Sequence, residues 1–379
     1  EFRRVLFRSV ALLSLYLESL GLKIIKYLPD RKKEGYGVSI NAIDHAFSKN
    51  QKLIIALDCG IKAHKQVEYA KEKGIEFIIC DHHNPDKNLP KALAILNPKR
   101  KDCAYPFKEL CGCGVGFKLV QAIESKQSKD NQIINYLDLV ALAIAADVVP
   151  LTGENRVLSF IGLQIINSNP RPGVHSLLKK NVKKEYTISD LMYYVGPRIN
   201  AAGRMKHASL ALELLICNDI NSVEKLALEI EDLNTSRRDV EKDITSQAIE
   251  QVDNSSEKLS SIVVFGSDWN KGVIGIVASR LVDKYYKPSI VFCESSKGVL
   301  TASARSIKGL DLYSVLNQCK GFIDQFGGHK YAAGLTIKKE NLERFKKHFE
   351  NIVSQIIDKN IFEKLLISVC PDGFLKKLR

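Results

Sequence analysis

The first part of the chain alternates between short apolar runs and longer amphipathic segments. A short apolar run between turn residues predicts a strand, and apolar residues recurring every three or four positions predict a helix. The predicted strands are 23–27, 52–57, 75–80 and 92–96, and the predicted helices are 10–21, 39–50 and 63–73. Because a strand, a helix and a further strand joined by short links form a right-handed crossover, this order predicts a parallel sheet.

From about residue 115 the pattern becomes helical, with helices expected at 115–124, 131–146 and 155–167. The segment 137–146 is apolar on almost every side, which is typical of a buried helix. It ends at Asp147, and a carboxylate there is costly unless it is paired or metal-bound. The alternative is that Asp147 lies at the surface before Pro150.

A long polar segment with helical spacing, 219–253, separates this part from a second α/β pattern. The second pattern predicts strands at 261–265, 289–293 and 299–303 and a helix at 273–286. The predicted fold class is therefore α/β, with a parallel-sheet domain joined by a long helix to a smaller α/β domain.

Groups able to bind a metal follow two successive predicted strands. Asp58 follows 52–57, and Asp81, His82 and His83 follow 75–80. Right-handed crossovers place both strand ends at one edge of the sheet, where ligands bind in open α/β folds. We expect one His to bind a metal and the other to face substrate. The alternative is that Asp81 caps a turn beside two solvated His.

Three further segments have the composition of ligand-binding loops. Gly196 to Arg204 combines Arg, Asn and small residues that let a backbone approach a phosphate, although a packed turn with surface Arg fits equally well. Ser303-Ala304-Arg305-Ser306 follows a predicted strand. Gly327-Gly328 permits a tight turn, after which His329 is expected to open a helix; an ordinary turn is the alternative.

Charge and cysteine content narrow the class of protein. The chain has 56 basic and 43 acidic residues, a net charge of +13 that favours a polyanionic partner but also suits solvated Lys-rich faces. No apolar run reaches the length of a membrane span. The nine Cys form no disulfide pattern, as expected for reduced thiols in a cytoplasmic protein, and Cys111-Gly-Cys113 has no second Cys pair for zinc.

Seven short motifs follow one another along the chain, each weak alone. They are Pro29-Asp30-Arg31 with Glu34-Gly35-Tyr36-Gly37, Asp58-Cys59-Gly60, Asp81-His82-His83, Ala146-Asp147-Val148-Val149-Pro150, Gly196 to Arg204, Ser303-Ala304-Arg305-Ser306, and Gly327-Gly328-His329. Together, from about residue 10 to 356, they resemble the DHH phosphoesterases and, within them, the RecJ single-strand-specific exonucleases.

The resemblance implies two Mn²⁺ or Mg²⁺ ions held by carboxylates and His, and two-metal hydrolysis. It implies that Asp58 bridges the metals, that His82 and Asp147 are further ligands, that Asp81 supports them, and that His83 contacts the phosphate. The residues implied to hold the 5′-phosphate end of a strand are Arg31, Ser303 and Arg305. Those implied to face the same groove are Asn200, Arg204 and His329.

The chain departs from the family pattern at its beginning. The family's first motif, an Asp-rich loop, is expected just before Val10, where residues 2–9 contain no Asp. Residues 1–9 are therefore expected to be a non-native segment, and this chain to bind one metal poorly and to have little activity. The expected domains are a truncated DHH domain at 10–218, a connecting helix at 219–255, a DHH-associated domain at 256–358, and the start of an OB-type domain at 359–379.

The implied activity is metal-dependent 5′-to-3′ exonuclease action on single-stranded DNA, in DNA repair and recombination. One alternative is a DHH oligoribonuclease or cyclic-dinucleotide phosphodiesterase, which the long helix and the Arg31 motif disfavour. Another is a catalytically inactive DHH subunit that binds nucleic acid. The implied partners are single-stranded DNA, a single-strand-binding protein and a helicase. The expected protein is a cytoplasmic monomer without a membrane partner.

Overall fold

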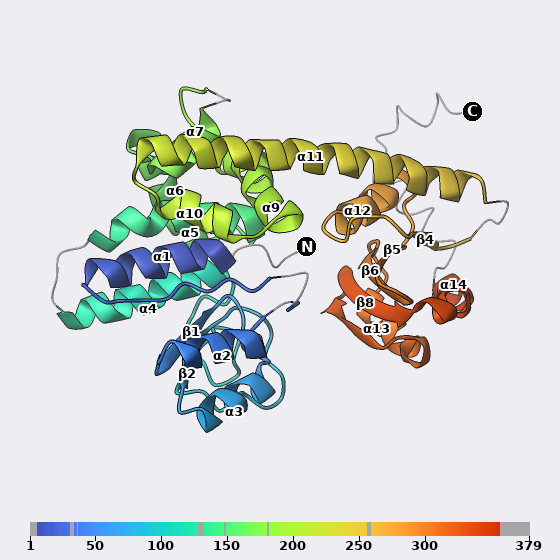
Figure 1. Ribbon diagram of the computed structural model, residues 1–379, viewed down its shortest axis with the longest axis horizontal. Helices are drawn as coiled ribbons and strands as arrows, with labels where there is room; N and C mark the ends of the chain where they lie inside the picture. Colours follow the sequence, from blue (N-terminus) through green and yellow to red (C-terminus); the bar gives the residue numbers. More distant parts are fainter. Residues whose placement is uncertain are drawn as a thin grey trace. The chain divides into compact units, whose positions relative to one another are not determined.

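The computed structural model describes residues 6–30, 34, 35, 37–127, 132–147, 149–179, 182–255 and 259–356. The chain divides into two compact units, Phe2–Thr235 and Ser236–Arg379. The division falls inside the long helix α11 (Ile220–Asp253), which is drawn in yellow in Figure 1.

The N-terminal unit contains a parallel sheet in the order β1-β2-β3. Its strands are β1 (Leu53–Leu57), β2 (Glu76–Cys80) and β3 (Ala94–Leu96). The helices that alternate with them are α2 (Ile40–Ser48) and α3 (His64–Glu72). Ile43 of α2 and Val67 of α3 share an apolar cluster with Phe77 and Ile79 of β2. Burial of these apolar side chains holds both helices against the sheet.

The rest of this unit is helical. Its elements are α1 (Leu6–Ser19), α4 (Gly112–Gln127), η1 (Gln132–Tyr136), α5 (Leu137–Asp147), α6 (Gly153–Ser168), α7 (Pro172–Leu178), α8 (Ile188–Asp190), η2 (Leu191–Val195), α9 (Gly196–Met205) and α10 (Ser209–Ile216). Residues 137–145 of α5 are all buried, as its apolar composition predicts. Helix α1 packs against α4, α5 and α10.

The C-terminal unit contains a mixed sheet in the order β4-β5-β6-β8-β7. Strands β4 (Ile262–Gly266) and β5 (Ser289–Ser296) are parallel, and the remaining pairs are antiparallel. Those remaining strands are β6 (Val299–Arg305), β7 (Gln325–His329) and β8 (Ala332–Lys338). The other elements are α12 (Ile274–Tyr285), α13 (Leu312–Gln318), η3 (Lys320–Phe322), η4 (Lys339–Asn341) and α14 (Leu342–Ile356). The predicted fold class is thus confirmed.

Five sequence predictions about elements were wrong. The first three residues of the expected loop Ser303-Ala304-Arg305-Ser306 lie within strand β6. Segment 23–27 is not a strand, because it offers no apolar face to bury: Ile25 is 43% exposed. The segment Gly196–Met205 is a helix rather than a turn. His329 ends strand β7 instead of opening a helix, and a Cβ on Gly328 would lie 2.4 Å from the Ala332 oxygen of β8. The first helix begins at Leu6 rather than Val10, with Phe7 and Arg8 in the interior.

Among the described residues, no helix combines the length and apolar character needed to cross a membrane. The expected OB-type segment at 359–379 lies outside the described residues.

Candidate metal centre

The two predicted strand ends lie side by side at one edge of the parallel sheet. Leu57 of β1 is paired with Cys80 of β2, so Asp58 and Asp81 are the next residues on neighbouring strands. The Asp58 N–H donates to the Cys80 carbonyl at 2.8 Å, and the Asp81 N–H donates to the Leu96 carbonyl at 3.0 Å. These bonds continue the sheet by one residue and fix both backbones. The predicted common edge is therefore confirmed.

Asp58 turns sharply out of β1 and packs against the first turn of α4. Its backbone is left-handed, with φ of +58°, a conformation in which Asp is better tolerated than most residues. A Cβ at position 112 would lie 2.0 Å from Oδ1 of Asp58. Only glycine at this position lets the carboxylate stay in place, so Gly112 is part of the site although it carries no chemistry.

Asp81 holds the two histidines and does not project a free oxygen of its own. Its Oδ1 accepts from the backbone N–H of His82 at 2.7 Å and of His83 at 3.1 Å, and lies 2.6 Å from His83 Nδ1. Its Oδ2 accepts from the Ile61 N–H at 3.0 Å. Burial opposes ionisation, but His83 and these backbone donors lower the pKa of Asp81 to about 2. Asp81 is thus an ionised anchor.

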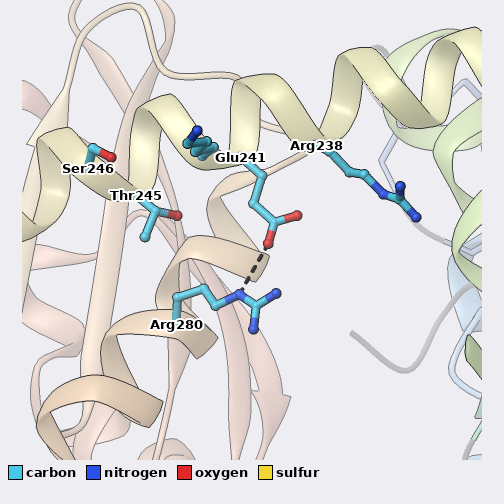
Figure 2. Close-up of a pocket in the computed structure, with 6 residues that line it drawn as sticks. Arg238, Glu241, Thr245, Ser246 and Arg280 are labelled. Atoms are coloured by element: carbon cyan, nitrogen blue, oxygen red, sulfur yellow. Dashed lines mark hydrogen bonds and ion pairs between the residues drawn. The ribbon is translucent and has the colours of Figure 1, made fainter.

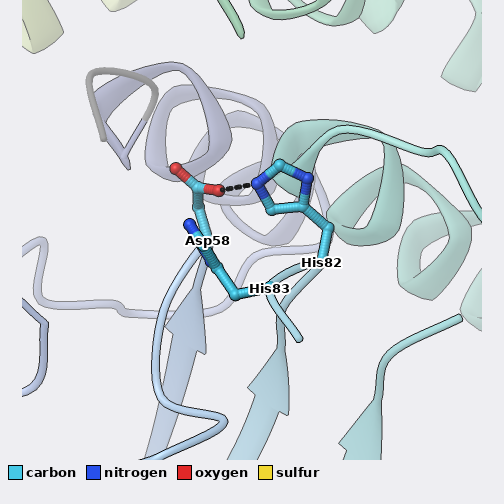
Figure 3. Close-up of side chains that lie close together, drawn as sticks. All are labelled: Asp58, His82 and His83. Atoms are coloured by element: carbon cyan, nitrogen blue, oxygen red, sulfur yellow. Dashed lines mark ion pairs between the residues drawn. The ribbon is translucent and has the colours of Figure 1, made fainter. Parts of the chain in front are cut away.

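The hydrogen bonds of the two imidazoles fix which nitrogen each can offer. Nδ1 of His82 lies 3.1 Å from the Leu110 carbonyl, which can only accept, so Nδ1 carries the proton. Its Nε2 then faces Oδ1 of Asp58 at 3.1 Å (Figure 3). Nδ1 of His83 is bound to Asp81, which leaves its Nε2 available. An imidazole anchored through Nδ1 by a carbonyl or carboxylate is the usual arrangement of a metal-binding His.

Three ligand atoms, one each from Asp58, His82 and His83, lie within 4.8 Å of one another. The group adds His83, for which the resemblance implied a phosphate contact, to the predicted ligands Asp58 and His82. The predicted ligand role of Asp147 stays a prediction. The two His are not solvated, since His82 is 9% exposed and His83 is half-buried. Burial lowers the pKa of His82, but the Asp58 carboxylate more than offsets this and the net shift is upward.

Asp147 is buried beside this group rather than at the surface, with 3% exposure. Neither carboxylate oxygen has a hydrogen-bond partner within the described part of the chain. Burial and the Asp58 charge raise the pKa of Asp147 well above its usual range, although His82 and Arg8 act in the opposite direction. A buried carboxylate without a donor is stable when a cation neutralises it.

The donor set fits one hard or borderline divalent cation. Carboxylate oxygens and imidazole nitrogens are ligands of Mn²⁺ and Mg²⁺. Adjacent ligands of an octahedral ion with bonds of about 2.1 Å are about 3.0 Å apart. The 3.1 Å between His82 Nε2 and Asp58 Oδ1 matches that spacing.

Arg8 is a positively charged residue that interacts with Asp147 and Asp58, and the sequence interpretation missed it. It is fully buried in the first turns of α1. Burial lowers its pKa to about 10, while the Asp147 charge, followed by smaller contributions that include Asp58, favours its charged form. The signal was present: Ala11 and Leu12 follow at helical spacing, which places Arg8 on the apolar face of α1. The expectation that residues 1–9 are non-native left Arg8 out of the predicted site.

The other predicted residues of this unit lie on α9. Asn200 is 9% exposed, and its Oδ1 accepts no hydrogen bond from any described residue. Arg204 is half-buried near the end of the helix. Arg198, from the same motif, is used internally: its Nε pairs with Glu231 at 2.6 Å and its Nη1 donates to the Tyr194 carbonyl at 2.7 Å. Arg31 lies outside the described residues.

The remaining predicted residues belong to the C-terminal unit. Ser303 and Arg305 lie two positions apart on β6 and so share a face of the sheet. Arg305 Nη1 donates to Ser303 Oγ at 3.0 Å and to the Ala304 carbonyl at 2.8 Å. His329 is exposed at the end of β7. The phosphate-binding roles of these three residues stay predictions.

Both units match known protein families. The DHH family, N-terminal domain, matches residues 7–144, and the DHHA1 domain matches residues 257–355. The chain is 39% identical to the single-stranded-DNA-specific exonuclease RecJ of Haemophilus influenzae over 97% of its own length. It is 38% identical to that of Bacillus subtilis over 91% of its length. It spans 67% of the Haemophilus protein and 44% of the Bacillus protein.

The fold is similar to that of a solved metal complex. The crystal structure of RecJ from Thermus thermophilus in complex with Mn²⁺ matches with a TM-score of 0.82 and 27% sequence identity. The match covers 93% of this chain and 51% of that one. The similarity therefore extends over both units.

Proposed function

Because this chain belongs to the RecJ family of single-stranded-DNA-specific exonucleases, we propose that it is the nucleolytic part of such an enzyme. The enzyme with a complete first motif hydrolyses phosphodiester bonds of single-stranded DNA from the 5′ end. The observation that supports this most is the convergence of Asp58, His82 and His83 within 4.8 Å at the strand ends of the DHH domain. Buried carboxylates and imidazoles at that edge are suited to metal-assisted hydrolysis.

The residues of the centre have separate tasks in this proposal. Asp58, His82, His83 and Asp147 hold the cation. When bound, a Mn²⁺ or Mg²⁺ ion lowers the pKa of the attacking water and stabilises the negative charge of the phosphate. Asp81 orients the His83 imidazole through Nδ1 and fixes the backbone of both histidines by accepting from their N–H groups. The Leu110 carbonyl orients His82 through Nδ1. The missing side chain of Gly112 leaves the space that the Asp58 carboxylate occupies.

The described residues do not offer a ligand set for a second ion. Two carboxylates and two imidazoles suffice for one cation, and the buried Arg8 already adds a positive charge beside Asp147. We propose that this chain holds one ion well, binds a second poorly, and has little activity. Replacement of residues 1–9 by the Asp-rich loop of a RecJ relative adds carboxylates and removes Arg8, and is expected to give an active enzyme.

The proposed polarity comes from capture of one strand end. Ser303 and Arg305 present a hydroxyl and a guanidinium from one face of β6, a donor pair suited to a terminal phosphate. Arg31, which lies outside the described residues, is proposed to bind the phosphate end of the same strand. Asn200, Arg204 and His329 are proposed to contact the same strand. Holding the 5′-phosphate end fixes which bond is hydrolysed first.

The test uses single strands labelled at one end and Mn²⁺. We compare the chain, the chain with residues 1–9 replaced, and the Asp58→Asn form of the latter. The proposal predicts mononucleotides from the 5′ end only with the replaced chain, and none after Asp58→Asn. Cleavage of dinucleotides alone would support the small-substrate alternative. Binding of single strands without cleavage would support an inactive binding subunit.

The cellular setting follows from the same proposal. A 5′-to-3′ exonuclease on single strands acts in DNA repair and recombination, together with a helicase and a single-strand-binding protein. The chain is proposed to act as a monomer in the cytoplasm, where DNA lies and thiols stay reduced. Eight described Cys are free, including the buried Cys111 and Cys113 at the metal centre.

A further inference from the structure

A basic pocket lies in the C-terminal unit, between the second half of α11 and α12 (Figure 2). Its volume is about 320 Å³. The residues that line it are Arg238, Glu241, Lys242, Thr245, Ser246 and Arg280. On α11 they recur three, four and seven positions apart and therefore share one face of the helix. Ile244 and Ala248, on another face, are buried.

Glu241 organises the pocket without neutralising it. Its carboxylate accepts from Arg237 Nη1 at 2.6 Å and from Arg280 Nε at 3.2 Å. Figure 2 shows Arg280 reaching from α12 to this carboxylate. The Glu241 side chain is 10% exposed, whereas that of Arg280 is 59% exposed. The buried carboxylate thus holds the Arg280 guanidinium through Nε, while most of the Arg280 side chain stays exposed.

The remaining lining groups are mostly hydrogen-bond donors without a partner in the described ranges. Arg238, Lys242 and the terminal nitrogens of Arg280 have none there. The Thr245 Oγ1 is buried and also lacks a partner among those residues. Three cations and an unused hydroxyl around one cavity are suited to an oxyanion, and Arg in particular to phosphate.

The shape and composition of the pocket indicate which phosphate it takes. The lining contains no aromatic residue on which a base could stack, so the pocket is suited to the sugar-phosphate backbone of a nucleic acid rather than to a base. The cavity is large enough for a phosphate with its attached sugars. It is separate from Ser303 and Arg305, which adjoin Gly275 of α12. Residues 275 and 280 are about 140° apart around that helix.

We propose that this pocket binds an internal phosphodiester group of single-stranded DNA and retains the strand outside the strand-end subsite. This inference rests on the proposed function, because the ligand of the pocket is the single-stranded DNA on which the proposed enzyme acts. The pocket contributes affinity and not chemistry. Each charge-assisted contact to a phosphate adds to binding and to its dependence on salt.

The test is binding of a 5′-phosphorylated, phosphorothioate-linked DNA strand in Mn²⁺ at several salt concentrations. The pocket variant is Arg238→Gln with Lys242→Gln, which leaves the Glu241 pairs intact. The matched control is Lys308→Gln with Lys320→Gln, two exposed positions of the same unit with the same charge change. Thermal unfolding verifies that both variants fold.

The pocket variant is expected to bind roughly tenfold or more weakly. Its salt slope should fall by about 0.7 for each lost phosphate contact. The control should lie within about twofold of the wild-type chain. Equal losses of DNA affinity in both double variants, or no loss in either, would overturn this inference and leave the proposed function standing. Stabilisation by inorganic phosphate that the pocket variant loses, with DNA affinity unchanged, would also overturn it. A wild-type chain that binds no single-stranded DNA would overturn the proposed function as well.

Discussion

The Nε2 atom of His82 lies 3.1 Å from Oδ1 of Asp58, across the ends of two neighbouring strands. Because Nδ1 of His82 donates to the Leu110 carbonyl, a neutral His82 presents a lone pair to that carboxylate oxygen. Two acceptors this close require a positive charge between them. A proton supplies it in the metal-free protein, in agreement with the raised pKa of His82, and a divalent ion supplies it when bound.

Gly112→Ala should disrupt metal binding although residue 112 is not a ligand. The added Cβ would lie 2.0 Å from Oδ1 of Asp58 and must displace the carboxylate. Mn²⁺ affinity measured by calorimetry is expected to fall at least about tenfold. Gly114→Ala is the matched control, because its Cβ would meet nothing closer than Leu110 at 3.4 Å. Equal affinities for the two variants would show that Asp58 tolerates displacement.

Asp81→Asn should weaken the same site by loosening both histidines. The amide keeps an acceptor for the backbone but loses the charge that pairs with His83 at 2.6 Å. Loss of such a supporting group costs about 10–100-fold in metal affinity. The measurement is the competition of the variant with a chelator of known Mn²⁺ affinity. An unchanged affinity would indicate that the His83 orientation is fixed by other contacts.

Arg8→Met should strengthen Mn²⁺ binding. The substitution removes a buried positive charge that interacts with Asp147 and Asp58 and keeps a side chain of similar length. The affinity is expected to rise about tenfold, equivalent to about 1.4 kcal/mol. Thermal unfolding in chelator serves as the control, since replacement of a buried charge by an apolar side chain is often neutral for stability. Weaker binding by Arg8→Met would place Arg8 among the groups that support the ion.

Tyr16→Phe should destabilise the N-terminal unit in a pH-dependent way. Tyr16 donates to Glu124 at 2.8 Å between α1 and α4, and both side chains are buried. Loss of this bond should cost about 1–2 kcal/mol at pH 8. Burial and Glu124 raise the pKa of Tyr16 to about 12.

The sign of the pH effect follows from that shift. The pKa of Tyr16 is higher in the folded chain than in the unfolded chain, where it is about 10. The resulting contribution to the free energy of unfolding is therefore complete below pH 10 and is lost as pH rises from 10 towards 12. The difference between Tyr16→Phe and the wild-type chain in urea unfolding should therefore shrink between pH 8 and pH 10.5. A difference that stays constant would show that Tyr16 ionises equally in both states.

The strand-end location of the site could be predicted from sequence, because alternation of strand and helix fixes the edge at which Asp58 and Asp81 lie. The buried helix α5 could be predicted from its apolar composition. The Leu110 carbonyl and Gly112 could not, because they reach the site from a distant segment and carry no side-chain signal. Arg8 could have been found only by extending the predicted first helix back to include it.

The most direct test of the metal centre is a calorimetric titration of Mn²⁺ into the wild-type chain, Asp58→Asn and Asp86→Asn. Asp86 is an exposed acid of the same unit that pairs with Lys62 at 3.0 Å, so it controls for loss of one negative charge. We predict one tightly bound ion in the wild-type chain and in Asp86→Asn, and an affinity more than about 100-fold lower in Asp58→Asn. Equal Mn²⁺ binding by all three proteins would contradict the assignment of Asp58, His82 and His83 as the metal site.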